Sequence, residues 1–324
     1  MDAAASFYHK PVLLDECIDG LNINPNGIYV DGTLGGGGHA AVLCGRLTTG
    51  RFVGIDRDAE AIEVASHRLF AMQVNGRPRM DIVRGNFHDV KALLSGVGIH
   101  SIDGALVDLG VSSHQLDEGT RGFSYHEDAP LDMRMDTAEP LTARDIVNGW
   151  PQGDIVRILR DFGEEQWAVQ IARVICDRRR ENPIHTTLDL VRIIDIAVPK
   201  KVRMRDTAHP ARRTFQALRI AVNDELEPLS RALEDFTMLL APGGRLAVIA
   251  FHSLEDRLVK QTFRRLINPC ECPSGFPVCV CGKKPVARAV TRKPIVAASA
   301  ELEDNVRARS ATLRIIEKIG NGDA

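Results

Sequence analysis

The sequence predicts an α/β fold in which a doubly wound, mostly parallel sheet is interrupted by a helical domain. Over the first 109 residues, apolar runs typical of strands alternate with amphipathic segments typical of helices, a pattern that indicates a parallel sheet. The alternation stops at about Gln115 and resumes at about Thr214. We therefore expect a discontinuous sheet domain, residues 1–114 and 214–324, and an inserted helical domain, residues 115–213.

The first predicted strand leads into a glycine-rich loop. Residues 28–30 are apolar strand formers, and four consecutive glycines at 35–38 precede a helix predicted over 40–47. Glycine lets a ligand approach the backbone closely, and the first turn of a helix offers unpaired N–H groups. The loop is a candidate site for a nucleotide-like ligand; a flexible turn is the alternative.

The second predicted strand, residues 51–55, ends at an acidic residue with an informative spacing. Asp56 follows Gly37 by 19 residues, and an acid about 20 residues past the loop is placed to bind the two ribose hydroxyls of an adenosine. The glycines are more crowded than in the dinucleotide motif Gly-x-Gly-x-x-Gly, and Asp31 precedes them. This crowding suits a cofactor without a pyrophosphate, such as S-adenosylmethionine. A nicotinamide-dependent oxidoreductase would use the same strand, loop and acid and is the alternative.

Two further strands bring side chains to the same edge of the sheet. Strands predicted over 81–84 and 102–109 place Phe87 and Asp108 near their carboxyl ends, where ligands bind in doubly wound sheets. Phe87 can stack on an adenine or pack in the core. Asp108 can hold the ammonium group of a cofactor or face a target amine.

The inserted region combines predicted helices, over 164–178 and 187–198, with an excess of positive charge. Residues 178–213 contain ten Lys or Arg and four Asp or Glu, in a chain whose net charge is −2. A local excess of this kind indicates a surface that contacts phosphates.

The returning part of the sheet domain begins with a long apolar stripe at Thr214. Pro228 is expected to divide this stripe into two helices. A buried strand is predicted over 245–251, and the last two strands over 294–296 and 311–317.

His252 follows the late buried strand and therefore reaches the ligand edge. An imidazole there can titrate near neutrality, which makes His252 a candidate catalytic residue. The alternative for this stretch is structural, because Ser253 and Asp256 form a pair similar to a capping box.

Four of the seven cysteines lie in a pattern that can ligate a metal. Cys270-x-Cys272 and Cys279-x-Cys281 can supply four thiolates to a structural zinc ion, although common zinc loops have two residues between the cysteines. The alternative is a set of reduced thiols. The odd cysteine number does not fit a secreted disulfide scaffold. The chain also lacks a long apolar run and a signal peptide pattern, so we expect a soluble cytoplasmic protein with no membrane segment.

Eight segments of the chain are long and unusual: HKPVLL (9–14), DGTLGGGGH (31–39), DLGVSSHQ (108–115), RGFS (121–124), PLDMRMD (130–136), TFQALRI (214–220), FHSLEDR (251–257) and NVRARS (305–310). They resemble the signature segments of the RsmH (MraW) family, and the matches run from residue 9 to about residue 317. The resemblance implies a Rossmann-like class I methyltransferase fold with an inserted helical domain. It also implies transfer of a methyl group from S-adenosylmethionine to the N4 amine of a decoding-centre cytidine in the 16S rRNA of the small ribosomal subunit. The implied cofactor contacts are Gly37, Gly38, His39, Asp56, Phe87, Asp108 and Gln115.

The implied reaction needs a proton acceptor and a platform for the base. The N4 amine of cytosine is a poor nucleophile because its lone pair is delocalised into the ring, so an enzyme must align it and accept a proton. Asp108 and His252 are the candidates for catalysis. Many amino methyltransferases have Asp-Pro-Pro-Tyr after the fourth strand, whereas Asp108 is followed by Leu-Gly-Val, so Phe123 and Tyr125 become candidates for stacking. A non-catalytic ribosome-assembly factor is a further alternative, but such a factor would lack the edge acids, and Asp56 and Asp108 are both present.

Overall fold

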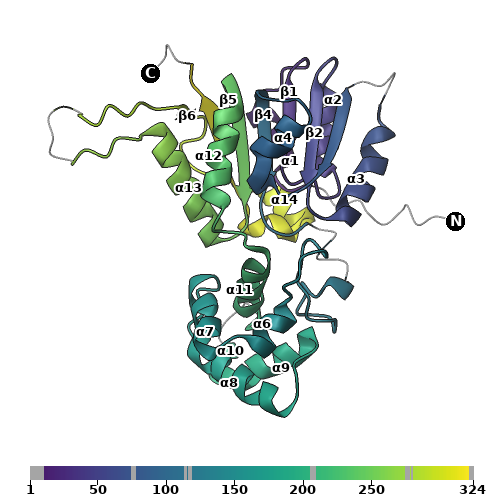
Figure 1. Cartoon of the computed structure of the whole chain (residues 1–324), viewed down its shortest axis with the longest axis vertical. Coiled ribbons are helices and arrows are strands. Elements are labelled where there is room, and N and C mark those ends of the chain that lie inside the picture. The colour runs from purple at the N-terminus through teal and green to yellow at the C-terminus, as the bar shows by residue number, and fades with distance from the viewer. Residues whose placement is uncertain are drawn as a thin grey trace. The chain divides into compact units, whose positions relative to one another are not determined.

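The computed structural model describes residues 11–73, 78–112, 115, 119–204, 209–273, 278 and 280–320, and the chain divides into two compact units (Figure 1). The sheet unit consists of Met1–Gly110 and Leu226–Ala324, and the helical unit consists of Val111–Glu225. Each unit is built around apolar cores of its own.

The sheet unit contains one seven-stranded sheet. Its strands are β1 (Ile28–Asp31), β2 (Arg51–Asp56), β3 (Arg79–Arg84), β4 (Ile102–Asp108), β5 (Leu240–Ala250), β6 (Ala287–Ala289) and β7 (Thr312–Lys318). They lie in the order β3-β2-β1-β4-β5-β7-β6. Strands β1 to β5 pair in parallel, and β7 runs antiparallel to β5 and β6. The predicted doubly wound, mostly parallel sheet is confirmed, with its reversal of strand order between β1 and β4.

Helices cover both faces of this sheet, because successive strand residues point to opposite faces. Tyr29 and Leu106 lie in one core, whereas the next residues, Val30 and Val107, lie in the other. The first core also takes side chains from α1 (Leu14–Leu21), α2 (Gly38–Arg46) and α3 (Ala59–Phe70), and the second from α4 (Val90–Gly96), α12 (Leu229–Leu239) and α13 (Ser253–Ile267). Three short elements complete the unit: η1 (Phe87–Asp89), α14 (Ser299–Asp304) and η3 (Val306–Ser310).

The final pair of strands differs from the prediction. The strand predicted over 311–317 is β7. Its two neighbours in the sheet are β5 and β6, and the segment 294–296 is not a strand of the sheet. Ile295 forms only an isolated bridge with Leu313. Pro294 has no N–H to donate to a ladder, which explains why this apolar stretch does not extend into a strand.

The helical unit has a core made almost entirely from helices. The boundary between the helical and the sheet domain was predicted between residues 213 and 214. The helical unit instead extends to Glu225, because Phe215 and Leu218 of α11 lie in its core. The stripe that begins at Thr214 is divided between units: Asp224, in a left-handed conformation, ends α11, and Pro228 caps α12. The helices are α6 (Ala143–Gly149), α7 (Gln152–Asp161), α8 (Ala168–Glu181), α9 (Thr187–Ala197), α10 (Lys200–Arg203) and α11 (Arg212–Asn223), with a short η2 (Gly119–Arg121). Among the helices described in both units, none combines the length and the apolar character that crossing a membrane requires.

Candidate active site

The glycine loop between β1 and α2 is attached to the neighbouring strands by backbone hydrogen bonds. The Gly32 N–H donates to the carbonyl of Leu106 in β4 at 2.8 Å, and the Leu34 N–H donates to the carbonyl of Ile55 in β2 at 2.9 Å. α2 then begins at Gly38 without a side-chain cap. The loop thus presents main-chain donors at the carboxyl edge of the sheet.

The glycines of the loop differ in what surrounds them. Gly37 has a φ of +72°, and a Cβ at this position would lie 3.2 Å from the Cβ of Ala65. At Gly38 a Cβ would lie 2.6 Å from Cγ of Pro11. By contrast, a Cβ at Gly36 would have no described atom within 4 Å. A ligand can therefore approach the backbone most closely at Gly36, which was not among the predicted site residues.

Asp56 ends β2 and connects this strand to the loop. Its Oδ2 accepts a hydrogen bond from the Gly35 N–H at 2.7 Å, and its Oδ1 accepts one from the Asp58 N–H at 2.9 Å. Each carboxylate oxygen can accept a second hydrogen bond. Burial raises the pKa of Asp56, and its two backbone hydrogen bonds oppose this effect. The carboxylate is thus held in place while it keeps acceptor capacity for hydroxyl groups.

Asp108 ends β4 beside the loop and has an unsatisfied buried oxygen. Its N–H donates to Oγ1 of Thr33 at 2.6 Å, which fixes the strand end against the loop. Among the described residues, no group makes a hydrogen bond to Asp108 Oδ1, although this atom is buried. The side chain as a whole keeps 26% of its surface exposed. A buried acceptor without a donor is costly, so this position favours a ligand that brings an N–H.

His39 lies on the first turn of α2, close to the carboxylate of Asp108. Its Nε2 is 3.0 Å from the carbonyl of Val12, which can only accept, so Nε2 carries the proton. Nδ1 then has a lone pair and lies 3.8 Å from Asp108 Oδ2. Burial lowers the pKa of His39 to about 4, so the ring is neutral and supplies no positive charge to Asp108.

A second buried acid adds to the electrostatics of this edge. Asp31 ends β1, next to β4, and burial raises its pKa to about 7. Burial raises the pKa of Asp108 as well, and the charges of Asp31 and Glu255 add to the effect. Neither Asp31 nor Glu255 is among the predicted site residues, although the position of Asp31 at the end of a strand was a signal. Acids crowded in this way favour a positively charged or hydrogen-donating ligand.

Phe87 lies in η1, directly after β3, as predicted. It is half-buried and packs against the core on its face of the sheet, and its ring contacts that of His88 edge to face with 4.4 Å between centroids. The structure therefore places Phe87 at the carboxyl edge of the sheet, where its side chain also packs against the apolar core.

Three of the residues predicted for the site, one for the cofactor and two for stacking on a base, belong to the helical unit. Gln115 accepts a hydrogen bond from the Ser112 N–H through its Oε1 at 3.1 Å. Phe123 is buried in the helical core. Tyr125 is half-buried and stacks on His209, with 4.7 Å between ring centroids. Tyr125 also packs against this core, so both aromatic residues contribute to the packing of the helical unit.

His252 is the N-cap residue of α13. Its Nδ1 accepts a hydrogen bond from the Glu255 N–H at 3.3 Å, and Glu255 Oε2 accepts the His252 N–H at 3.2 Å. The capping box predicted for Ser253 and Asp256 is wrong by one residue, because His252 and Glu255 form the box. Asp256 instead accepts hydrogen bonds from Nε and Nη2 of Arg314, at 2.7 and 3.0 Å. A backbone N–H can only donate, so Nδ1 of His252 is the acceptor in this cap, and Nε2 lies 3.1 Å from Oε1 of Glu255.

The basic segment of the helical unit is partly neutralised by its own acids. Arg178, Arg192 and Arg203 form ion pairs with Glu181, Asp189 and Asp195 at 3.4, 3.0 and 2.8 Å. Four cations of the segment are exposed and have no acidic partner within 4 Å among the described residues: Lys200, Lys201, Arg212 and Arg213. The predicted phosphate-contacting surface thus narrows to these four residues.

The strand order with an antiparallel β7, the glycine loop after β1 and the acids that end β2 and β4 define the class of protein. This combination is that of a Rossmann-like methyltransferase, an enzyme that uses S-adenosylmethionine as the methyl donor. More particularly, the chain belongs to the MraW methylase family, whose model matches residues 6–319. The resemblance found in the sequence is therefore confirmed, and the oxidoreductase alternative is excluded.

Three relatives, each called ribosomal RNA small subunit methyltransferase H, illustrate how close the similarity is. The protein from Ruminiclostridium cellulolyticum is 54% identical over 314 residues, which cover 97% of this chain and 99% of the relative. The protein from Symbiobacterium thermophilum is 54% identical over 319 residues, covering 98% and 99%. The protein from Brevibacillus brevis is 50% identical over 315 residues, covering 97% and 99%.

Proposed function

We propose that this methyltransferase modifies the N4 amine of a decoding-centre cytidine in the 16S rRNA of the small ribosomal subunit. The names of its relatives support small-subunit ribosomal RNA as the substrate, and the segments shared with the family support the amine as the target. The structural observation that best supports an amine as the target is the buried Oδ1 of Asp108, which accepts no hydrogen bond from the described residues. A ribosomal substrate implies that the enzyme works in the cytoplasm.

The residues at the sheet edge suit the cofactor. S-adenosylmethionine supplies an electrophilic methyl group on a sulfonium sulfur. We assign Asp56 to the ribose hydroxyls, because both its oxygens are already positioned by backbone N–H groups. Phe87 is assigned to the adenine. The backbone of Gly37, Gly38 and His39 is assigned to the loop side of the cofactor, and Gln115 is added on the family resemblance alone.

Asp108 is the residue best suited to the amine chemistry. Its unsatisfied oxygen can accept a hydrogen bond from an N–H of the target or from the cofactor ammonium. A methylated amine must lose a proton, and burial raises the pKa of Asp108, which makes its ionised carboxylate a stronger proton acceptor. We assign to Asp108 the alignment of the amine and the acceptance of this proton.

The role of His252 at the base stays a prediction, and a pair of variants decides it. His252→Ala removes the helix cap and is expected to lower the free energy of unfolding by about 1 kcal/mol. His252→Asn keeps an oxygen that can cap the helix but has no titrating imidazole. If His252 is a cap only, His252→Asn retains both stability and the single-turnover rate of methyl transfer. A stable His252→Asn enzyme with a rate about 10²–10⁴-fold lower would identify the imidazole as catalytic.

We propose that Lys200, Lys201, Arg212 and Arg213 contact RNA phosphates. The double variant Lys200→Glu/Lys201→Glu is expected to weaken RNA binding and to reduce the slope of log affinity against log salt by roughly 1.4–1.8, because two phosphate contacts are lost. The measurement is a fluorescence titration of a small-subunit RNA fragment at several salt concentrations. The control, Arg178→Glu/Arg180→Glu, changes the same number of exposed charges at positions already paired with acids. Equal slopes for the wild type and Lys200→Glu/Lys201→Glu would contradict the assignment.

The central experiment is transfer of labelled methyl from S-adenosylmethionine to purified small subunits, followed by digestion and nucleoside analysis. We expect the label in N4-methylated cytidine. Label in another nucleoside would contradict the proposed target. A non-catalytic ribosome-assembly factor would bind the subunit and transfer no label.

A further inference from the structure

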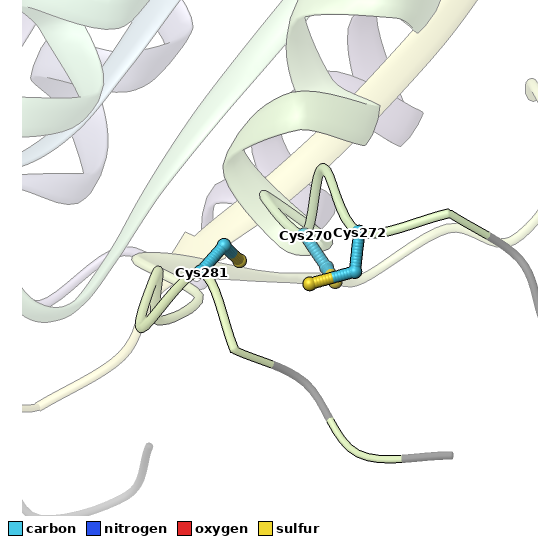
Figure 2. A group of neighbouring side chains, drawn as sticks. All are labelled: Cys270, Cys272 and Cys281. Carbon is cyan, nitrogen blue, oxygen red and sulfur yellow. The ribbon is translucent and has the colours of Figure 1, made fainter. Parts of the chain in front are cut away.

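A segment between α13 and β6 leaves the sheet unit and returns to it. Figure 1 shows its two arms, drawn in yellow-green beyond α13. Cys270 and Cys272 lie on the outgoing arm, shortly after α13 ends at Ile267, and Cys281 lies on the arm that returns to β6. The three Sγ atoms all lie within 4.8 Å of one another, and Figure 2 shows the sulfur of Cys281 directed toward the other two.

Apolar packing does not explain why these side chains meet. Cys270 is exposed, and Cys272 and Cys281 are half-buried. Val278 and Val280, between the cysteines, are 70% and 72% exposed, so the described residues at the outer end of the arms are not anchored in a core. Cysteines that serve packing are usually buried, as Cys17, Cys44 and Cys176 are in this chain. The three arm cysteines therefore differ in surroundings from the packing cysteines.

Two contacts join the outgoing arm to the returning arm beside these cysteines. The Val280 N–H donates a hydrogen bond to Sγ of Cys272 at 3.3 Å, from the returning arm to the outgoing one. Lys283 and Lys284 follow Cys281 closely, and Lys283 pairs with Glu271 of the outgoing arm. Both contacts hold the two arms together where the three sulfur atoms meet.

We propose that Cys270, Cys272 and Cys281 bind a zinc ion that ties the two arms together. Four thiolates around zinc at about 2.3 Å lie about 3.8 Å from one another, so the observed grouping needs only a small contraction. Soft thiolate ligands select zinc over magnesium or calcium. Cys279, the fourth cysteine of the predicted set, lies outside the described residues, and the proposal rests on the other three.

The first test is the metal content of the full-length enzyme purified without chelator. We expect about one zinc per chain by inductively coupled plasma mass spectrometry, and almost none in Cys272→Ser or Cys281→Ser. Cys176→Ser, which changes a buried cysteine of the helical core, is the matched control and should keep its zinc. Cobalt added to metal-free enzyme should give the intense sulfur-to-cobalt charge-transfer band of a thiolate site, and this band should be weak in Cys272→Ser.

The second readout is local and does not depend on activity. Removal of zinc by a chelator should make the arms, residues 268–286, sensitive to a protease, while cofactor affinity stays unchanged because the glycine loop is a separate structure. Wild-type enzyme without bound zinc and without a cobalt band would overturn the proposal. So would zinc content that persists in Cys272→Ser, or a disulfide between two of the three cysteines found by mass spectrometry of enzyme kept under reducing conditions.

Discussion

Asp108→Asn is expected to lower the single-turnover rate of methyl transfer to the small subunit by about 10²–10⁴-fold, the range typical of a lost general base. An asparagine keeps the size of the side chain but cannot take a proton. Cofactor affinity is expected to fall as well if Asp108 Oδ1 also holds the cofactor ammonium. The measurement is rapid-quench methyl transfer with enzyme in excess over subunits.

Asp103→Asn is the matched control, because Asp103 lies at the other end of β4 and its Oδ2 accepts the Ile28 N–H at 2.7 Å. This variant should keep its transfer rate. A wild-type rate for Asp108→Asn would contradict the assignment of Asp108 to catalysis.

Stability separates this loss from simple unfolding. Burial raises the pKa of Asp108 in the folded state, so the folded protein binds more protons than the unfolded chain above about pH 4 and loses stability as pH rises toward the folded pKa. Asparagine does not titrate. In urea denaturation without cofactor, Asp108→Asn should therefore be at least as stable as the wild type, with an advantage that grows as the pH rises above about 4.

Asp56→Ala is expected to raise the dissociation constant of S-adenosylmethionine by about 10- to 150-fold, because hydrogen bonds to a charged group contribute about 1.5–3 kcal/mol. The loss concerns binding and should be seen directly by calorimetry. Because Asp56 also holds the Gly35 N–H, a shift of the loop could contribute to the effect.

A second variant removes this ambiguity. Gly36→Ala adds a methyl group where the protein has no described atom within 4 Å, so it should fold normally and still weaken cofactor binding. Gly45→Ala, at an open position of α2, is its control. If Asp56→Ala and Gly36→Ala both keep the wild-type affinity, the cofactor does not lie against the loop in the way proposed.

Local patterns in the sequence were enough to predict the sheet and its ligand edge. A buried parallel strand is a run of apolar residues, and the first polar residue after the run marks its carboxyl end. Asp56 and Asp108 could therefore be placed at strand ends without a structure. The same reasoning places Asp31 at the end of β1. The glycine loop and the spacing of Asp56 indicated an adenosine-type cofactor, and the family resemblance added its identity and the expected substrate.

Several features depended on contacts between distant parts of the chain. α11 and α12 form one apolar stripe in sequence, but α11 completes the helical core, because Phe215 and Leu218 pack there. The basic segment has a net positive charge in sequence, whereas the folded helices pair four of its arginines with nearby acids. Which cations stay exposed is decided by helix geometry and not by composition.

The sequence by itself determined the class of fold, the order of its elements and the residue types at the carboxyl edge, because these follow from short-range periodicity and turn chemistry. Only the tertiary structure decided how those residues are engaged. It makes His252 the cap of α13, since backbone angles select the side chain that reaches the helix N-terminus. It also leaves Asp108 Oδ1 buried without a donor and brings three cysteines from two arms together, because burial and proximity depend on segments that are far apart in the chain.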